Sequence, residues 1–145
     1  MTAALRPMAL DDVPAVYRLG TACYDCTAIP YVFWTLAEVC HHFESFPDLC
    51  VVAEADGAVV GFGLAAPSYE LLEGTGHVEW VAVAPEQRRD GLAMRLVETL
   101  LDALKERGCQ TVIADVTGAN EPSRRLFARA GFDEGTTITF FTRGL

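Results

Sequence analysis

The chain has 145 residues, 51% of them hydrophobic, and a formal net charge of −9. This length and composition predict a single folded domain over residues 1–145 with a substantial apolar core. The acidic charge argues against nucleic acid as a partner, and no apolar run reaches the roughly 18 residues of a membrane span. Arg6 and Asp11 interrupt the N-terminal apolar run too early for a signal peptide, and five scattered cysteines are typical of reduced thiols, so we expect a cytoplasmic protein.

Hydrophobic periodicity and turn residues predict the element order β-α-α-β-β-β-α-β-α-β. The expected strands are 5–8, the two strands of the hairpin 49–67, 76–85, 111–116 and 136–141. The expected helices are 10–20, 35–46, 91–107 and 120–132. Thr35 and Glu38 have the spacing of a capping box, and Asp56-Gly57 is a strong hairpin signal. Strands that alternate with helices in the second half indicate a mixed α/β sheet.

The turn between the strand that ends at Pro85 and the longest predicted helix combines two arginines with a glycine. The first N–H groups of a helix have no internal partner, and the helix dipole adds partial positive charge, so a turn of this kind can bind an anion. Arg88 and Arg89 can add charge-assisted bonds to phosphate, and Gly91 permits close backbone approach. A purely structural turn is the alternative, because glycine is the usual residue in tight turns.

Three motifs resemble those of the GNAT superfamily of acyl-CoA-dependent N-acyltransferases. The stretch RRDGLA resembles the family's R/Q-x-x-G-x-G/A motif, VAVAP its central strand, and NEPSRRLFARAGF its N-x-x-A-x-x-x-Y-x-x-x-G-F motif. The opening LRPMALDDVPAVYRL is also similar to the family's usual start, so the resemblance covers nearly the whole chain. It implies a mixed, mostly antiparallel central sheet with flanking helices, whose splayed central strands form the acyl-CoA cleft. It further implies acetyl-CoA as cosubstrate and, because related enzymes are often dimers, allows a homodimer.

The resemblance also implies which residues bind the cofactor. Backbone amides of residues 88–94 would hold the CoA pyrophosphate, and the backbone of residues 81–83 would pair with the pantetheine arm. The expected cofactor-binding residues are Val81, Ala82, Val83, Arg88, Arg89, Asp90, Gly91, Leu92, Ala93, Met94, Asn120, Ser123 and Phe127. Helix capping is the alternative for Asn120. Two residues depart from the family pattern: Asp90 stands where Lys, Arg or Gly is usual, and Phe127 replaces a tyrosine that often protonates the leaving thiolate.

Acyl transfer from a thioester to an amine by direct attack needs a base and an oxyanion donor but no enzyme nucleophile. We expect Glu79 as the catalytic base and His77 as the second choice. The two residues lie on one face of a regular strand, and Val81 and Val83 would continue that face. An exposed strand face is the alternative for both. By resemblance, the oxyanion donor would be the backbone N–H of Val81.

An aromatic segment before the hairpin is the predicted acceptor site, and Tyr31, Phe33 and Trp34 are its expected substrate-binding residues. Core packing is the alternative for these side chains. The predicted function is transfer of an acetyl group from acetyl-CoA to a primary amine. A protein N-terminus or lysine is the first choice of acceptor, because IPYVFW and GHVEWVAV resemble N-terminal protein acetyltransferases; a small polyamine or amino-sugar is the second.

Two other function classes remain open from the sequence. Phe127 and Asp90 motivate a non-catalytic, acyl-CoA-binding or regulatory GNAT-like module. The pair Cys23 and Cys26, followed by the run 40–42 (Cys-His-His), motivates a zinc-stabilised interaction domain. A second well-spaced pair is missing, however, and adjacent residues of a helix splay around its axis, so no metal site is expected.

Overall fold

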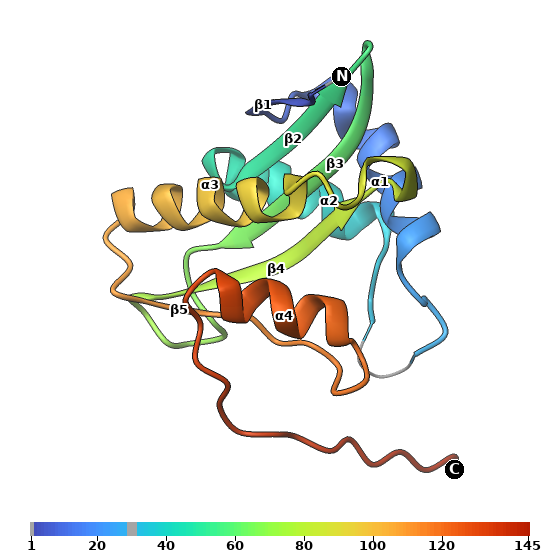
Figure 1. Cartoon of the computed structure of the whole chain (residues 1–145). Coiled ribbons are helices and arrows are strands. Elements are labelled where there is room, and N and C mark those ends of the chain that lie inside the picture. The colour runs from blue at the N-terminus through green and yellow to red at the C-terminus, as the bar shows by residue number, and fades with distance from the viewer. Residues whose placement is uncertain (1, 29–31) are drawn as a thin grey trace.

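A sheet in the strand order β1-β2-β3-β4-β5 forms the centre of the computed structural model, which describes residues 2–28 and 32–145 (Figure 1). The strands are β1 (Ala4–Pro7), β2 (Cys50–Ala55), β3 (Ala58–Ala66), β4 (Thr75–Val83) and β5 (Thr111–Ile113). Neighbouring strands run antiparallel from β1 to β4, and β5 is parallel to β4. The predicted mixed, mostly antiparallel sheet is therefore confirmed.

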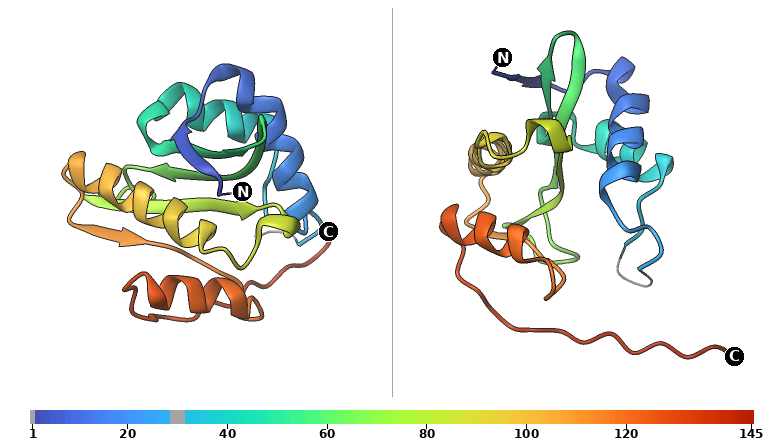
Figure 2. Two further views of the ribbon diagram at one scale, coloured as in Figure 1. Left: turned by 45° about the horizontal axis from the view of Figure 1, so that its top comes forward. Right: turned by 45° about the vertical axis from the view of Figure 1, so that its right-hand side comes forward.

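Helices cover both faces of the sheet (Figure 2). They are α1 (Val13–Cys23), α2 (Leu36–Ser45), α3 (Leu92–Glu106) and α4 (Glu121–Arg129), with short 3-10 turns η1 (Leu10–Asp12), η2 (Pro47–Leu49) and η3 (Pro85–Gln87). The first two helices pack on one face around Phe62, and α3 packs on the other with the apolar stripe that the sequence predicted. No helix in the described part of the chain is long and apolar enough to cross a membrane.

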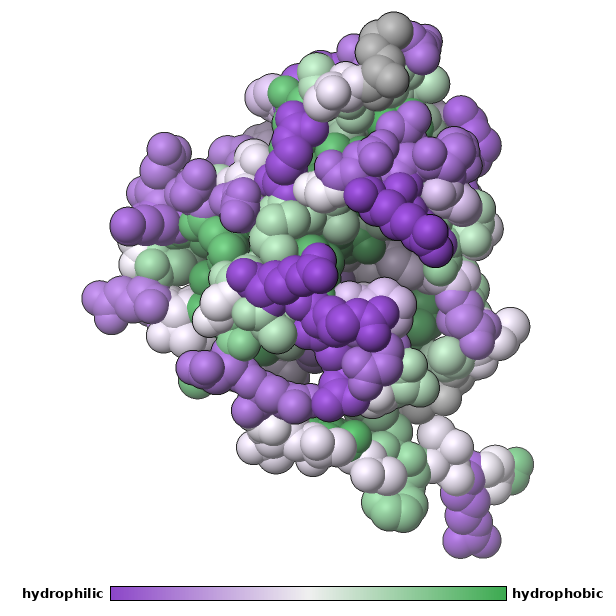
Figure 3. All heavy atoms as spheres, viewed as in Figure 1, coloured by the Kyte–Doolittle hydropathy of each residue, from purple (hydrophilic) through white to green (hydrophobic). Residues whose placement is uncertain are grey.

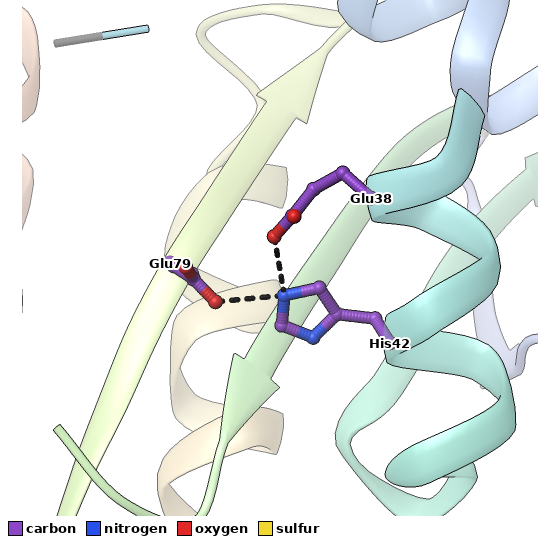
Figure 4. A group of neighbouring side chains, drawn as sticks. All are labelled: Glu38, His42 and Glu79. Atoms are coloured by element: carbon purple, nitrogen blue, oxygen red, sulfur yellow. Dashed lines mark ion pairs between the residues drawn. The ribbon is translucent and has the colours of Figure 1, made fainter. Parts of the chain in front are cut away.

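Local sequence signals explain most of these elements. Asp56 and Gly57 have φ values of 52° and 77°, the left-handed conformation that a two-residue hairpin turn requires. The Thr35 side chain accepts a hydrogen bond from the backbone N–H of Glu38 at 3.1 Å, as the capping spacing predicted. The Glu38 side chain does not complete a reciprocal capping box, because it points to the neighbouring sheet face instead (Figure 4).

A β-bulge in β4 changes which side chains share a face. Leu64 pairs with Trp80, but Ala65 pairs with Val78, so Glu79 is the extra residue on β4. Trp80 packs with the α1–α2 cluster, whereas Val81 packs against the α3 cluster. The prediction that Val81 and Val83 continue the face of Glu79 is therefore wrong, since it assumed a regular strand. The bulge presents Glu79 to helix α2.

The predicted last strand, 136–141, is also wrong. No strand follows β5 within the described residues, and residues 132–145 run away from the sheet (Figure 1). Ile138 is 67% exposed and Phe141 is 91% exposed, and Figure 3 shows side chains of this tail protruding below the molecule. Threonine, isoleucine and phenylalanine favour extended backbone locally, but a strand forms only where another strand offers an edge. The neighbouring β5 is only three residues long and is itself shorter than the predicted 111–116.

Gly20 in α1 permits helix α1 to pack directly on Trp34. A Cβ atom on residue 20 would lie 2.2 Å from Cζ2 of Trp34, whose indole N–H donates to the carbonyl oxygen of Tyr17 at 3.1 Å. Because Trp34 is buried and stacks on Phe62, it has no room to move. We expect Gly20→Ala to lower the free energy of unfolding by about 1–3 kcal/mol.

Chemical denaturation of the variant and of wild type measures this difference. Gly118→Ala is the matched control, because a Cβ atom there has no neighbour within 4 Å. An unchanged denaturation midpoint for Gly20→Ala would contradict the close packing.

Candidate active site

Three ionisable side chains meet where helix α2 crosses the bulge of β4 (Figure 4). Nε2 of His42 lies 2.7 Å from Oε2 of Glu79 and 3.3 Å from Oε1 of Glu38. Glu38 and His42 are four residues apart on α2 and therefore project from the same side of that helix. The indole N–H of Trp80 also donates to Oε1 of Glu38, at 3.3 Å. We call Glu38, His42 and Glu79 the carboxylate–histidine cluster.

The surroundings of His42 indicate an imidazolium ion. Its side chain is only 1% exposed, and Nδ1 lies 3.1 Å from the carbonyl oxygen of Ala65. Nε2 lies beside two carboxylates and Nδ1 beside a carbonyl oxygen, surroundings that favour the doubly protonated ring. Burial lowers the pKa of His42, but hydrogen bonds and charge from Glu38 and Glu79 outweigh it and raise the pKa to about 9. The neighbouring His42 in turn lowers the pKa of Glu38.

This shifted pKa predicts how stability depends on pH. The pKa of His42 rises from 6.5 in an unfolded chain to about 9 in the folded protein. Its contribution to stability is therefore complete below pH 6.5 and disappears as the pH rises through about 9. We expect wild type to lose roughly a few kcal/mol of unfolding free energy over this window. Denaturation at a series of pH values measures it, and a His42→Gln variant whose stability falls equally over the window would contradict the assignment.

A cavity of about 310 Å³ lies beside the carboxylate–histidine cluster. Its lining residues are Glu38, His41, His42, Phe46, Ala66, Ser68 and Glu79. Both carboxylates remain partly accessible, at 28% for Glu38 and 29% for Glu79, while the imidazole is buried behind them. A ligand in this cavity would therefore meet carboxylate oxygens, which attract cations and hydrogen-bond donors.

His77, the second expected base, belongs to a different group. Its Nε2 lies 2.6 Å from Oδ1 of Asp115, and its ring makes an edge contact with Tyr69 at 4.9 Å between centroids. The structure thus brings Glu79 together with Glu38 and His42 and pairs His77 with the loop after β5.

The turn before α3 has the geometry of an anion site. Gly91 has φ +73°, and a Cβ atom there would meet no atom within 4 Å, so the backbone is open to close approach. The N–H of Arg95 bonds to the carbonyl of Gly91, which leaves the preceding N–H groups of the first turn, those of residues 92–94, without a partner inside the helix. The side chain of Arg88 turns back toward β4, where its Nε donates to the carbonyl of Val83 at 3.1 Å. This open, positively polarised turn fits a pyrophosphate group.

Strands β4 and β5 separate partway along β4. They pair only between Thr75–His77 and residues 111–113, so from Val78 onward β4 is not paired with β5. The remainder of that edge, including Val81, leads from the bulge at Glu79 toward the turn at Gly91. An extended ligand arm could pair with backbone groups along such an edge.

The residues expected on α4 have clear structural roles. The side chain of Asn120 caps the helix by accepting from the N–H of Ser123 at 3.2 Å, which is the alternative that the sequence allowed. Phe127 packs partly buried against the α3 cluster and makes an edge contact with Phe132 at 5.2 Å. A phenyl ring at this position offers no proton to a leaving thiolate.

The three aromatic residues expected at the acceptor site do not share one environment. Trp34 is buried in the core beneath α1, so it is a packing residue rather than an exposed wall of a pocket. Phe33 is exposed, and Tyr31 lies outside the described residues.

In residues 2–28 and 32–145, the group whose side chains could converge on a metal ion is Glu38, His42 and Glu79, and it contains none of the cysteines.

Sequence reasoning did not assign Glu38 and His42 to the site. The capping spacing with Thr35 explains Glu38 locally, and His42 stands next to Cys40 and His41 in the sequence. Their spacing of four residues on a predicted helix was the available signal. Nothing in the sequence indicated that this face of α2 would cross β4 at Glu79, because that depends on the bulge.

Comparisons with known proteins agree with the fold and this geometry. The model of the acetyltransferase (GNAT) family matches residues 13–132. An L-2,4-diaminobutyric acid acetyltransferase of Nocardia farcinica is 29% identical over 141 residues, which cover 95% of this chain and 68% of that enzyme. An aminoglycoside N(6')-acetyltransferase type 1 of Serratia marcescens is 33% identical over 95 residues, 62% of this chain but only 65% of that enzyme.

A solved structure extends the similarity to three dimensions. The diaminobutyrate acetyltransferase from Paenibacillus lautus, in complex with L-2,4-diaminobutyric acid and coenzyme A, superposes with a TM-score of 0.74 at 28% identity. The match covers 89% of this chain and 75% of that chain. The predicted resemblance is thereby confirmed. The chain belongs to the GNAT family of acetyltransferases, enzymes whose acyl donor is acetyl-CoA.

Proposed function

We propose that this chain transfers the acetyl group of acetyl-CoA to a primary amine by direct attack, with Glu79 as the catalytic base. The observation that carries the proposal is the bulge of β4, which presents the Glu79 carboxylate to a cavity beside the strand edge that leads to Gly91. Donor and acceptor would then meet at Glu79. His77 is the less suitable base, because it pairs with Asp115 and is not among the residues that line the cavity, whereas Glu79 is.

In this proposal the donor end is bound mainly by backbone groups. The N–H groups of residues 92–94 would bind the pyrophosphate, and the open backbone at Gly91 lets the phosphates approach closely. Backbone groups of residues 81–83 would pair with the pantetheine arm. The N–H of Val81 would stabilise the oxyanion as charge develops on the thioester oxygen.

The leaving thiolate needs no dedicated acid in this site. Phe127 stands where a tyrosine is common in the family, and it cannot donate a proton. A thiol has a pKa of about 8.5, so its thiolate is a tolerable leaving group near neutral pH. The absence of an acid at Phe127 is therefore compatible with turnover.

The cavity favours a small, cationic amine as the acceptor. Its volume of about 310 Å³ and its two partly exposed carboxylates suit a small molecule that carries an ammonium group. Related enzymes are named for diaminobutyric acid and for aminoglycosides, which are amines of this kind. This proposal therefore places a small amine before the protein acceptor that was the first choice from the sequence. A protein N-terminus or lysine is the second candidate, favoured by the exposed Phe33, which precedes α2.

An amine panel tests the proposal and identifies the acceptor. Wild type is incubated with acetyl-CoA and with L-2,4-diaminobutyric acid, polyamines, amino-sugars and short peptides, and thiol release is followed together with the mass of each amine. The proposal predicts thiol release that matches the amount of acetylated amine for at least one small amine. Binding of acetyl-CoA without thiol release for any amine would favour a non-catalytic binding module instead.

A further inference from the structure

We propose that Glu38 and Glu79 together bind the ammonium group of the acceptor, and that His42 is the residue that positions both carboxylates. This inference rests on the proposed acetyltransferase function and adds two residues of α2 to the acceptor site. Glu79 would act as the catalytic base, and Glu38 would contribute binding alone.

The geometry of the cluster directs the carboxylates toward the ligand. Nε2 of His42 lies within ion-pair distance of both carboxylates, 2.7 Å from Oε2 of Glu79 and 3.3 Å from Oε1 of Glu38. Each carboxylate has further lone pairs, and both are partly exposed beside the cavity while His42 is buried behind them (Figure 4). An ammonium group has three N–H donors in a compact arrangement, so it can bond to both carboxylates from the cavity side.

The charge of the cluster also suits one ammonium group. Two carboxylates and one imidazolium carry a single net negative charge, which one ammonium ion neutralises. Without the imidazolium, the two neighbouring carboxylates would repel each other with no cation between them. His41 is the other titratable ring near His42, with its centroid 6.2 Å away; it is exposed and also lines the cavity. His42 therefore supplies one positive charge beside both carboxylates.

The proton balance gives the two carboxylates different roles. The bound ammonium R–NH₃⁺ gives one proton to a Glu79 oxygen, and the free amine attacks the acetyl carbon. A C–N bond forms and the C–S bond breaks, and the thiolate takes the second proton that the nitrogen loses. The proton on Glu79 then returns to water. Glu38 receives no proton in this sequence, so removing its charge should affect amine binding and leave the chemical step intact.

Steady-state kinetics of Glu38→Gln test this division. The probe is L-2,4-diaminobutyric acid or, if another panel amine reacts faster, that amine. We expect KM for the amine to rise about 10- to 100-fold, the loss of one charged hydrogen bond, with little change in kcat or in KM for acetyl-CoA. Glu44→Gln, on the exposed side of the same helix, is the matched control and should behave as wild type.

The pH profile tests the role of His42. In His42→Gln the acid limb of the pH profile of kcat/KM for the amine should shift to higher pH by about one unit or more, because the carboxylates lose their fixed cation. A purely structural defect would lower activity without moving that limb. If the variant does not fold, 15N NMR of the wild-type imidazole replaces it, with both nitrogens expected to be protonated at pH 7.5.

The outcomes separate the two proposals. An active wild type with an unchanged amine KM in Glu38→Gln, or with a neutral His42 at pH 7.5, overturns this inference and leaves the acetyltransferase proposal standing. A wild type that acetylates no amine of the panel overturns the proposed function, and this inference with it.

Discussion

Replacing Glu79 with glutamine is expected to lower kcat by about 10²- to 10⁴-fold, the usual contribution of a positioned general base. The amide keeps the size of the side chain and can still contact His42 and Glu38, but it cannot accept the amine proton. Affinity for acetyl-CoA should change little, because the pyrophosphate site at Gly91 involves no Glu79 atom. Steady-state kinetics with the best panel amine, combined with calorimetric binding of acetyl-CoA, separate the two effects.

Two variants make this prediction specific. Glu86→Gln, at an exposed position beyond the end of β4, is the control for loss of one negative charge near the site. His77→Gln tests the rival base and should lower kcat far less than Glu79→Gln does. Equal losses of kcat and acetyl-CoA affinity in Glu79→Gln, or a larger loss of kcat in His77→Gln, would refute the assignment.

Replacing Gly91 with valine is expected to weaken acetyl-CoA binding by about 100-fold or more. The branched side chain would occupy the open space above the first turn of α3, where the phosphates must approach the backbone. A β-branched residue at φ +73° would also be strained, by roughly 1–3 kcal/mol. The affinity is measured by calorimetry on the folded variant.

Gly57→Val separates backbone strain from loss of the binding site. Gly57 has φ +77°, also has no atom within 4 Å of an added Cβ, and lies in the turn between β2 and β3. This variant should lose a similar amount of stability and keep wild-type affinity for acetyl-CoA. Unchanged affinity in Gly91→Val would show that the phosphates do not bind at this turn.

Most of the fold could be predicted because its signals are local. The Asp56-Gly57 turn, the Thr35 cap and the apolar stripe of α3 each depend on residues close together in the sequence. The last strand could not be predicted in the same way. Residues 136–141 have strand-forming side chains, but whether they pair depends on an edge supplied by a distant segment, and β5 offers only three residues.

The site was predicted only in part for the same reason. The family motif indicated Gly91 and the strand position indicated Glu79, but a regular strand would have turned Glu79 toward the α3 face along with Val81. The bulge opposite Leu64 and Ala65 reverses this and brings Glu79 to His42. A register shift of this kind depends on how two strands pair, and no spacing within one strand reveals it.

The most direct single measurement uses a bisubstrate analogue, in which CoA is joined through an acetyl-sized spacer to the nitrogen of the best panel amine. Its affinity is measured by calorimetry for wild type, Gly91→Val and Glu38→Gln. If one site holds the donor at Gly91 and the acceptor at Glu38 and Glu79, the analogue binds wild type at least about 100-fold more tightly than CoA, and each substitution weakens it. An analogue that binds no more tightly than CoA, and equally well to wild type and Glu38→Gln, would contradict the combined site.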